Sequence, residues 1–388
     1  MNKLNLILDL SNLFYRSLYS ANGFGSFCSY NDQDEINNFI RKLSIDICYV
    51  LRLFNPKTVI FALDDTSWRK ELLKDIHDSS LGYKGQRVKN ENMNWDNIFN
   101  SMNEFIKILS NNGFIVSKIK SAEADDLCSL WKDFIFEKNE NCIIVSSDAD
   151  IRQLVDYKNN NFCIVFNPIG AGKGGVKKIY CNNEFNDWIN KKDEVDIFFS
   201  NFDPLKSFLA NLSKNDKKIS YEIIDPNNIV LTKIFCGDDG DNIPSFYEYY
   251  DNKAKKQRIT PAKCKKILES LSINNTYDLD NKIPLLKNTI ESVIKKDIDD
   301  IDISKRLIRQ KKLVELKSNL FPTNIINEFL YSSNTFNNYK YVNVSNYKIN
   351  NLLNNTKYLD NSYNKPKEAS IFKELDRLIN KNIEGGLF

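Results

Sequence analysis

LNLILD at Leu4–Asp9 is a short apolar run that ends in an acid, and two later segments repeat this pattern. They are TVIFALDD at Thr58–Asp65 and CIIVSSDAD at Cys142–Asp150. Runs of about four to eight aliphatic and β-branched residues are typical of buried strands in a parallel sheet. The three segments therefore predict strands that each deliver an aspartate to their carboxyl end.

Helical periodicity fills the sequence between these runs, at 35–53, 95–110 and 122–136. Strands that alternate with helices predict an α/β fold, with a central, mostly parallel sheet flanked by helices. In such sheets the binding crevice lies beyond the carboxyl ends of the strands. We therefore expect Asp9, Asp64 and Asp148 to meet at one edge of the sheet.

The charge composition is nearly balanced, with 54 Lys and Arg against 51 Asp and Glu in 388 residues. This balance excludes a uniformly basic coating protein, so any affinity for nucleic acid requires basic and acidic residues to be segregated. The chain has one histidine, which excludes zinc sites that need two histidines and argues against a Ser-His-Asp triad. Carboxylates, and whatever they bind, must carry any hydrolytic chemistry.

The eight cysteines form no C-x-x-C pair, and most stand in apolar runs. This usage is typical of buried thiols in a reducing compartment. The N-terminal sequence lacks the features of a signal peptide, and no apolar run approaches the roughly 18 residues of a membrane helix. The sequence predicts a cytoplasmic protein without membrane contact.

The composition along the chain predicts four regions. They are an N-terminal α/β domain at 1–182 with a polar lid or arch at 66–94, a polar insertion at 183–222, a helical domain at 223–330, and a low-complexity stretch with a terminal helix at 331–388. The segment NPIGAGKGGVKKIY at 167–180 favours a glycine-rich hairpin over a phosphate loop, because Ser or Thr does not follow the Gly-Lys pair.

Further acids occur in AEADD at 122–126, in SSDAD and in GDDGDNIP at 237–244. Carboxylates gathered at one sheet edge repel one another, and divalent cations relieve that repulsion. An all-oxygen ligand set suits Mg²⁺ or Mn²⁺, and two such ions about 4 Å apart support phosphodiester hydrolysis. Ser121 is a candidate cap for the helix that follows it. On that helix Glu123 and Asp126 share a face, whereas Asp125 lies about 100° round the helix from Asp126. The three acids cannot all reach one metal ion equally, so one of them is expected to lie behind the ligands and to support them without binding the metal.

Taken in order, LILDLSNLFYRS, FALDDTSWR, YKGQR, AEADD, SSDAD and DPNNIVLTKIFCGDDGDNIPS resemble the motifs of the 5′-nuclease family. The family includes flap endonucleases, the 5′-exonuclease domain of bacterial DNA polymerase I and phage 5′-nucleases. The likeness is greatest to the T-even phage type of ribonuclease H, and KKLVELKSNLFP resembles its closing segment. The resemblance covers about residues 4–325. It implies a PIN-like nuclease fold with a helical arch and a C-terminal unit of the helix–hairpin–helix type.

The resemblance also implies roles for individual residues. Two Mg²⁺ ions, replaceable by Mn²⁺, would be held by Asp9, Asp64, Glu123, Asp125, Asp126, Asp148, Asp150, Asp238 and Asp241. Lys84 and Arg87 would be catalytic, stabilising charge on the scissile phosphate, and Tyr83 would stack on a base. The residues expected to bind nucleic acid are Arg69, Tyr83, Lys84, Arg87, Lys255, Lys256, Arg258, Lys263, Lys265 and Lys266.

One departure from the family pattern follows GDDGDNIP. Cellular members continue with a glycine-rich hairpin that often holds K⁺, whereas this chain continues SFYEYYDNKAKKQRITPAKCKK without a glycine. The departure argues against a K⁺ site. Lysines in the segment are expected to contact phosphates of the duplex instead.

The resemblance implies a Mg²⁺-dependent 5′→3′ exonuclease and flap endonuclease with ribonuclease H activity. Its substrates would be DNA with a 5′ flap or end and RNA–DNA hybrid, in primer removal during phage DNA replication. Expected partners are a sliding clamp, bound through Ile383–Phe388, and a single-stranded-DNA-binding protein, with the chain itself a monomer. Two alternatives stay open: a non-catalytic protein that binds branched DNA, and a PIN-type ribonuclease, a class that lacks the GDDGDNIP unit.

Overall fold

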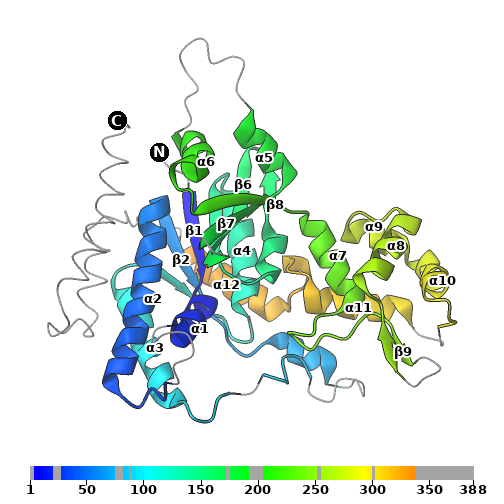
Figure 1. Cartoon of the computed structure of the whole chain (residues 1–388), viewed down its shortest axis with the longest axis horizontal. Helices are drawn as coiled ribbons and strands as arrows, with labels where there is room; N and C mark the ends of the chain where they lie inside the picture. The colour runs from blue at the N-terminus through cyan, green and yellow to red at the C-terminus, as the bar shows by residue number, and fades with distance from the viewer. Residues whose placement is uncertain are drawn as a thin grey trace. The chain divides into compact units, whose positions relative to one another are not determined.

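A computed structural model describes residues 4–20, 28–74, 82–87, 89–171, 175–191, 204–250, 255–298 and 302–336 (Figure 1). The chain divides into two compact units. The sheet unit comprises the described residues within Met1–Leu13, Thr58–Asn90 and Val116–Tyr341. The other, the α2–α3 unit, comprises those within Phe14–Lys57 and Glu91–Ile115.

The central sheet has the strand order β3-β2-β1-β4-β6-β7-β8, and β5 pairs with β6 beside this path. The strands are β1 Leu4–Asp9, β2 Thr58–Ala62, β3 Ile115–Ser117, β4 Asn141–Val145, β5 Asp156–Lys158, β6 Asn161–Ala171, β7 Val176–Cys181 and β8 Ile219–Ile223. Strand β1 pairs in parallel with both β2 and β4, and β4 pairs in parallel with β6. The mostly parallel α/β sheet predicted from the apolar runs is confirmed.

The glycine-rich segment after β6 forms the predicted hairpin, since β6 and β7 pair antiparallel. From the sequence, residues 183–222 are interpreted as a polar insertion with some helix. They form α5 (Asn183–Asn190), α6 (Pro204–Asn215) and most of β8, which pairs in parallel with β7. The insertion thus supplies an edge strand of the central sheet.

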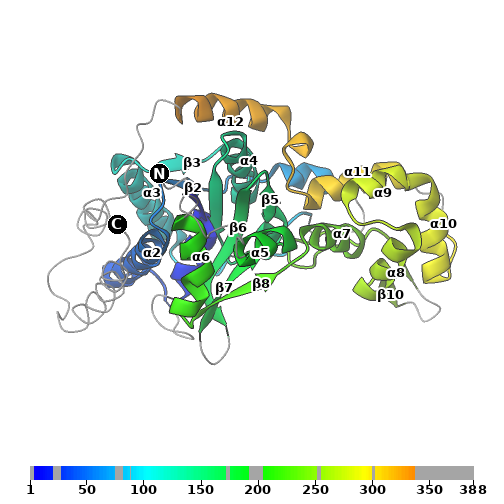
Figure 2. The same cartoon turned by 90° about the horizontal axis from the view of Figure 1, so that it is seen from above.

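Helix α4 (Ala124–Glu137) packs on β1, β2 and β4. Helix α12 (Thr323–Phe336) lies over α4, where the rings of Trp131 and Phe329 meet edge to face at 5.0 Å (Figure 2). Short 3₁₀ segments among the described residues of this unit include η1 (Trp68–Leu73), η2 (Asp150–Leu154) and η4 (Ser318–Leu320). Helix α1 (Leu10–Ser20) follows β1 directly.

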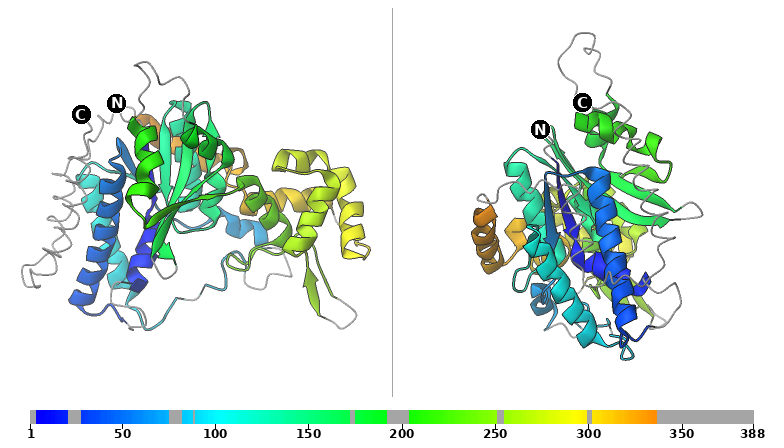
Figure 3. Two further views of the ribbon diagram at one scale, coloured as in Figure 1. Left: turned by 45° about the horizontal axis from the view of Figure 1, so that its top comes forward. Right: turned by 90° about the vertical axis from the view of Figure 1, so that its left-hand side faces the viewer.

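The helical group follows β8 in the chain (Figure 3). It consists of α7 Pro226–Cys236, α8 Pro261–Leu271, α9 Thr276–Asn281, α10 Ile283–Ile294 and α11 Ile303–Val314, with the hairpin of β9 (Glu248–Tyr250) and β10 (Lys256–Arg258). Asp225 and Thr260 cap α7 and α8, each followed by proline at the first turn, a preferred helix start. Phe235, Phe246 and Ile290 are fully buried in its core. This buried core also includes Leu73 of η1 and Tyr83.

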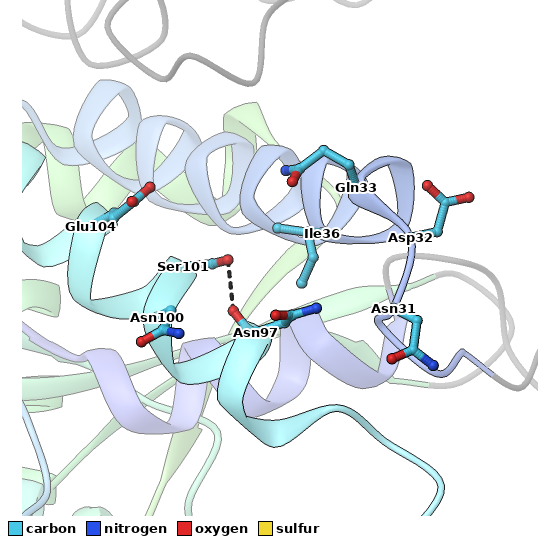
Figure 4. A pocket seen from close by; sticks show the side chains of 8 residues that line it. All are labelled: Asn31, Asp32, Gln33, Ile36, Asn97, Asn100, Ser101 and Glu104. Carbon is cyan, nitrogen blue, oxygen red and sulfur yellow. Dashed lines mark hydrogen bonds between the residues drawn. The ribbon is translucent and has the colours of Figure 1, made fainter.

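The α2–α3 unit contains α2 (Gln33–Phe54) and α3 (Trp95–Asn111). The ring of Phe14 packs against those of Phe39 and Phe99. A polar pocket of about 210 Å³ lies between the start of α2 and α3 (Figure 4). In its wall the Ser101 hydroxyl donates to the Asn97 carbonyl at 2.8 Å, so this group is satisfied within α3.

Some predictions concern residues outside the described ranges. The arch region, 66–94, is described except for 75–81 and 88, and the region 331–388 only as far as residue 336. The segment Ile383–Phe388, for which clamp binding is only a prediction, also lies outside the described residues. All eight cysteines are free thiols. Within the described ranges, no helix has both the length and the apolar character needed to cross a membrane.

Replacement of Ile143 by alanine tests the core of the sheet. Ile143 lies in β4 and is fully buried, so Ile143→Ala should lower the free energy of unfolding by about 2–5 kcal/mol through lost burial and a residual cavity. Urea denaturation measures this change. Ile308→Ala is the control, because Ile308 is 54% exposed and its loss should cost less than about 0.5 kcal/mol. Equal effects of the two substitutions would contradict the described core.

Candidate functional site

The carboxyl ends of the strands carry the predicted acids. Asp9 ends β1 and is buried, with its carboxylate accepting bonds from the Ser146 hydroxyl and the Asn12 amide, both at 2.9 Å. Asp64 follows β2 and accepts from the amide of Ala124 at 2.7 Å. Asp148 follows β4. The structure thus brings these acids to one edge of the sheet.

The acids at this edge repel one another, and this repulsion is visible in their raised pKa values. Burial, followed by repulsion from Asp64 and Asp148, raises the pKa of Asp9 to about 7. Burial, with Asp148 and Asp9 next, also raises the pKa of Asp125 well above its ordinary value. The pKa of Asp64 is raised chiefly by burial and also by Glu123. Such mutual repulsion is what an added cation would relieve.

The start of α4 differs from the sequence prediction. Its cap is Glu123, which forms a capping box with Asp126, and Ser121 does not cap the helix. Ser121 instead has a left-handed backbone, with φ of 67°, and its amide donates to Asp65 at 2.9 Å. Left-handed conformations are uncommon for residues other than glycine. Asp65, for which the sequence suggested no role, therefore holds the turn that aims Glu123.

Asp126 is fully enclosed by donors. Its carboxylate receives two bonds from the Arg69 guanidinium, at 2.7 and 3.1 Å, and one from the Trp68 indole at 3.1 Å. The backbone amide of Glu123 also donates to it, at 3.1 Å. Both oxygens of Asp126 thus already accept hydrogen bonds. This fits the expectation that one acid at the start of α4 lies behind the metal ligands and supports them without binding the metal.

Two residues predicted to contact nucleic acid are buried instead. Arg69 is only 2% exposed and binds Glu123 as well as Asp126, at 2.9 Å, so no part of it is left to meet a phosphate. Tyr83 is 5% exposed, and its hydroxyl lies 3.1 Å from Glu123 and 3.2 Å from Asp241. The expected stacking of Tyr83 on a base does not fit this position. Both predictions are corrected: these side chains support the acids.

Lys84 joins the sheet edge to the acidic loop after α7. Its ammonium group donates to Glu123 and lies 3.6 Å from Asp241. Burial would raise the pKa of Glu123, but Lys84 and Arg69 outweigh it and lower that pKa to about 2. Arg87, which is more exposed, binds the other oxygen of Asp241 at 2.5 Å. Lys84 and Arg87 are therefore beside the acids, and their contact with the scissile phosphate stays a prediction.

A second lysine bridge was not predicted. Lys233 of α7 donates to Asp150 and also to Asp238, at 2.5 Å. Burial acts to raise the pKa of Asp238, but the bond and the charge of Lys233, together with backbone bonds from Gly240 and Asp241, lower it below its ordinary value. In the sequence Lys233 is the single lysine of a mostly apolar helical segment, and nothing marks it as a partner of the acids. Only the packing of α7 against η2 shows that it faces Asp150.

The loop that carries Asp238 and Asp241 requires its first glycine. Gly237 has φ of 74°, and a Cβ there would stand 2.4 Å from the carbonyl oxygen of Ile243. The amides and carbonyls of Asp238 and Ile243 bond to each other at 2.9 and 2.8 Å and close the turn. The backbone approach explains why the motif begins with glycine.

The basic residues expected on the helical group lie on β10 and α8. Lys255, Lys256 and Arg258 come from β10 and its approach, and Lys263, Lys265 and Lys266 come from α8. Arg258 forms two bonds with Asp239, at 2.5 and 2.9 Å. The ammonium groups of Lys263 and Lys296 lie over the ring of Tyr249. Lys296 and Tyr249 extend this basic surface beyond the residues predicted.

Among the described residues, no group of three or more acids is placed closely enough to hold a metal ion with the present side-chain positions. Lys84 and Lys233 hold four of the acids in ion pairs. The donor set is nevertheless all oxygen and carries excess negative charge at Asp9, Asp64 and Asp125. Hard divalent cations prefer such donors. The residues present therefore fit a divalent metal in charge and ligand type.

By fold, the chain is an α/β protein with a mostly parallel sheet and an acidic carboxyl edge. Residues 4–185 match the model of the 5′-3′ exonuclease, N-terminal resolvase-like domain. A 5′-3′ exonuclease of Mycoplasmopsis pulmonis (strain UAB CTIP) is 23% identical over 321 residues, which are 81% of this chain and 86% of that protein. The phage T5 5′-exonuclease with bound zinc ions shares the fold at 16% identity and a TM-score of 0.50, over 85% of this chain and 97% of that one. Residues 4–185 therefore carry the N-terminal domain of the 5′-nuclease family.

The raised pKa of Asp9 predicts how stability depends on pH without divalent ions. A carboxyl that binds its proton more tightly when folded stabilises the fold at low pH, and this contribution is lost as pH rises through the folded pKa. Between about pH 4 and pH 7, the interval from the ordinary pKa of 3.8 to about 7, stability should fall by on the order of a few kcal/mol. Thermal unfolding in EDTA measures this slope.

Two controls accompany that measurement. Asp9→Asn cannot titrate and should flatten the slope. Mg²⁺ should raise the unfolding temperature more at about pH 8 than at about pH 5, because protons and the metal compete for the same oxygens. A wild-type protein whose stability increases steadily over this interval would contradict the described repulsion.

Proposed function

We propose that the chain is a Mg²⁺-dependent 5′→3′ exonuclease and flap endonuclease that hydrolyses phosphodiesters of DNA and of RNA–DNA hybrid. The observation that carries this proposal is the strained acid cluster at the sheet edge, flanked by Lys84 and Arg87. Acids supply ligands for the metal and cations supply charge for the phosphate. The N-terminal domain of the 5′-nuclease family at residues 4–185, and the activity stated for the M. pulmonis relative, support the same reaction.

The acids that would hold the metal ions are Asp9, Asp64, Glu123, Asp125, Asp148, Asp150, Asp238 and Asp241, with Asp126 behind them. When bound, divalent ions lower the pKa of attacking water and neutralise charge on the phosphate. Mn²⁺ would substitute for Mg²⁺ because it accepts the same oxygen donors. The zinc ions of the T5 5′-exonuclease support a divalent site in this fold.

The chain's own cations have separate tasks in this proposal. Lys84 and Arg87 orient the scissile phosphate and stabilise the negative charge that grows on it during attack. Arg69 holds Asp126 and Glu123 in place from the buried side. Lys233 draws the acidic loop toward Asp150. Tyr83 orients Glu123 and Asp241 through its hydroxyl.

The basic surface on β10 and α8 would bind the duplex beside the cleavage site. Lys255, Lys256, Lys263, Lys265 and Lys266 can neutralise phosphates, a mode of binding that reads no sequence. Removal of RNA primers during phage DNA replication, in the cytoplasm of a host cell and by a monomer, would use such sequence-independent recognition. A single-stranded-DNA-binding protein would be a partner at the displaced strand.

The rival proposals make different demands on the site. A non-catalytic protein that binds branched DNA has no use for a strained acid cluster, yet every acid expected from the family is present. A PIN-type ribonuclease would use the sheet edge alone. Here Lys84 and Lys233 tie the acidic loop of the helical group to that edge, which favours a site built from both parts.

Replacement of the acids after β4 tests the reaction. Asp148→Asn and Asp150→Asn should each lower Mg²⁺-dependent cleavage of a 5′-labelled flap by more than about 100-fold, because each weakens metal binding. Asp133→Asn, on the outer part of α4 and 42% exposed, is the control and should cleave normally. Retained activity in both acid variants would refute the metal assignment.

Deletion of Ile383–Phe388 tests the proposed clamp contact. If this apolar terminal segment docks on a sliding clamp, its removal should abolish stimulation of cleavage by the clamp and leave basal cleavage unchanged. Flap cleavage with and without the clamp, for both proteins, makes the comparison. Stimulation that survives the deletion would exclude the contact.

A further inference from the structure

Two turns of the sheet unit are held together by reciprocal amide side chains. The first, the arch-base turn, comprises residues 82–87, and the second, the acidic turn, comprises residues 238–243. The side chain of Asn242 donates to the carbonyl of Gly82 at 2.7 Å. In return, the side chain of Gln86 donates to the carbonyls of Asp239 and Gly240, at 2.8 and 3.0 Å.

These contacts depend on the donor end of each amide. Backbone carbonyls only accept hydrogen bonds, so the NH₂ groups of Gln86 and Asn242 must face them. The Oε1 atom of Gln86 is buried and has no partner within the described part of the chain. The orientation of Gln86 is therefore set by its two donated bonds.

The arch-base turn is also unusual in its backbone. Lys84 has φ of 54°, in the left-handed region, and its amide donates to the carbonyl of Asp241 at 2.9 Å. Asn242 of the acidic turn has φ of 55°, a conformation that asparagine tolerates better than lysine does. Strained backbone persists where surrounding contacts over-determine it. Here those contacts are the amide bonds on either side.

We propose that Gln86 and Asn242 form an amide clasp that positions Lys84 and Arg87 against the acidic turn. The inference rests on the proposed function, in which these two cations act on the phosphate. Their ion pairs with Asp241 must rearrange whenever they engage a phosphate. The clasp consists of uncharged bonds to backbone, so it fixes the turn independently of those ion pairs. Gln86 and Asn242 are positioning residues and do not contact the reacting atoms.

Three substitutions of Gln86 separate donor chemistry from bulk and charge. Gln86→Met keeps the length and removes the donors, Gln86→Glu turns acceptors toward the carbonyls, and Gln86→Lys restores donors. Gln33→Met is the matched control, because Gln33 donates within the α2 helix, to Asn37 at 3.0 Å. Thermal unfolding of each variant verifies that the protein is folded.

Amide hydrogen exchange in the two turns measures whether the clasp holds them, and it requires no cleavage of a substrate. Gln86→Met and Gln86→Glu should speed exchange about tenfold or more in both turns, because the Lys84 amide loses its fixed acceptor. Gln86→Lys and Gln33→Met should exchange like the wild type. Exchange that is unchanged in Gln86→Met would overturn the clasp.

The single-turnover rate of 5′-flap cleavage at saturating enzyme measures how well the clasp positions Lys84 and Arg87. Gln86→Met and Gln86→Glu should lower this rate about 10- to 100-fold, since small misplacements of catalytic groups are costly. Flap affinity should change less than about threefold, because the duplex-binding lysines are intact. Gln86→Lys should recover most of the rate. A normal rate in Gln86→Met, or no recovery in Gln86→Lys, would overturn the positioning role. An inactive wild type would refute the proposed function, and the exchange rates would still decide whether the clasp exists.

Discussion

Asp9 lies buried at the carboxyl edge of the sheet with Asp64 and Asp125 near it, and desolvation together with neighbouring carboxylates raises the pKa values of all three. A group of like charges in a region of low dielectric is unfavourable unless cations or protons accompany it. The arrangement around the edge follows from this requirement. Each element that approaches the acids brings a cation with it: η1 brings Arg69, the arch-base turn brings Lys84, and α7 brings Lys233.

The same requirement couples the sheet to the helical group. Asp238 and Asp241 are far in sequence from the sheet acids, yet Lys233 and Lys84 connect them to Asp150 and Glu123. Each ammonium lies between carboxylates of two different elements. The lysines therefore do two things at once: they reduce repulsion within the acid group and hold the acidic loop at the sheet edge. The attraction between charges has no preferred direction. The uncharged hydrogen bonds that Gln86 and Asn242 donate are directional, so they also orient the two turns relative to each other.

The sequence was sufficient for features encoded locally. β1, β2 and β4 were predictable because each is a continuous apolar run, and Asp9 and Asp64 because parallel strands end at one edge. Burial of Arg69 and Tyr83 was not predictable, since their partner Glu123 is 54 and 40 residues away. A motif can place such a residue near the site without showing which way it faces. The role of Lys233 and the edge strand β8 depend in the same way on packing that local periodicity does not encode.

The choice of cation at each position has a physical basis. The guanidinium of Arg69 is a planar fork that matches both oxygens of Asp126, and with 2% exposure this pair is removed from solvent. Such a bidentate, buried pair is suited to a fixed structural role. Lys84 and Lys233 present compact ammonium groups, which hold carboxylates by charge without demanding a planar match. A divalent cation that competes for the same oxygens can displace them more readily than it could displace Arg69. Four acids of the proposed metal site, Glu123, Asp150, Asp238 and Asp241, are thus paired with an exchangeable lysine. Asp126 behind them is held by the fixed arginine, which also contacts Glu123.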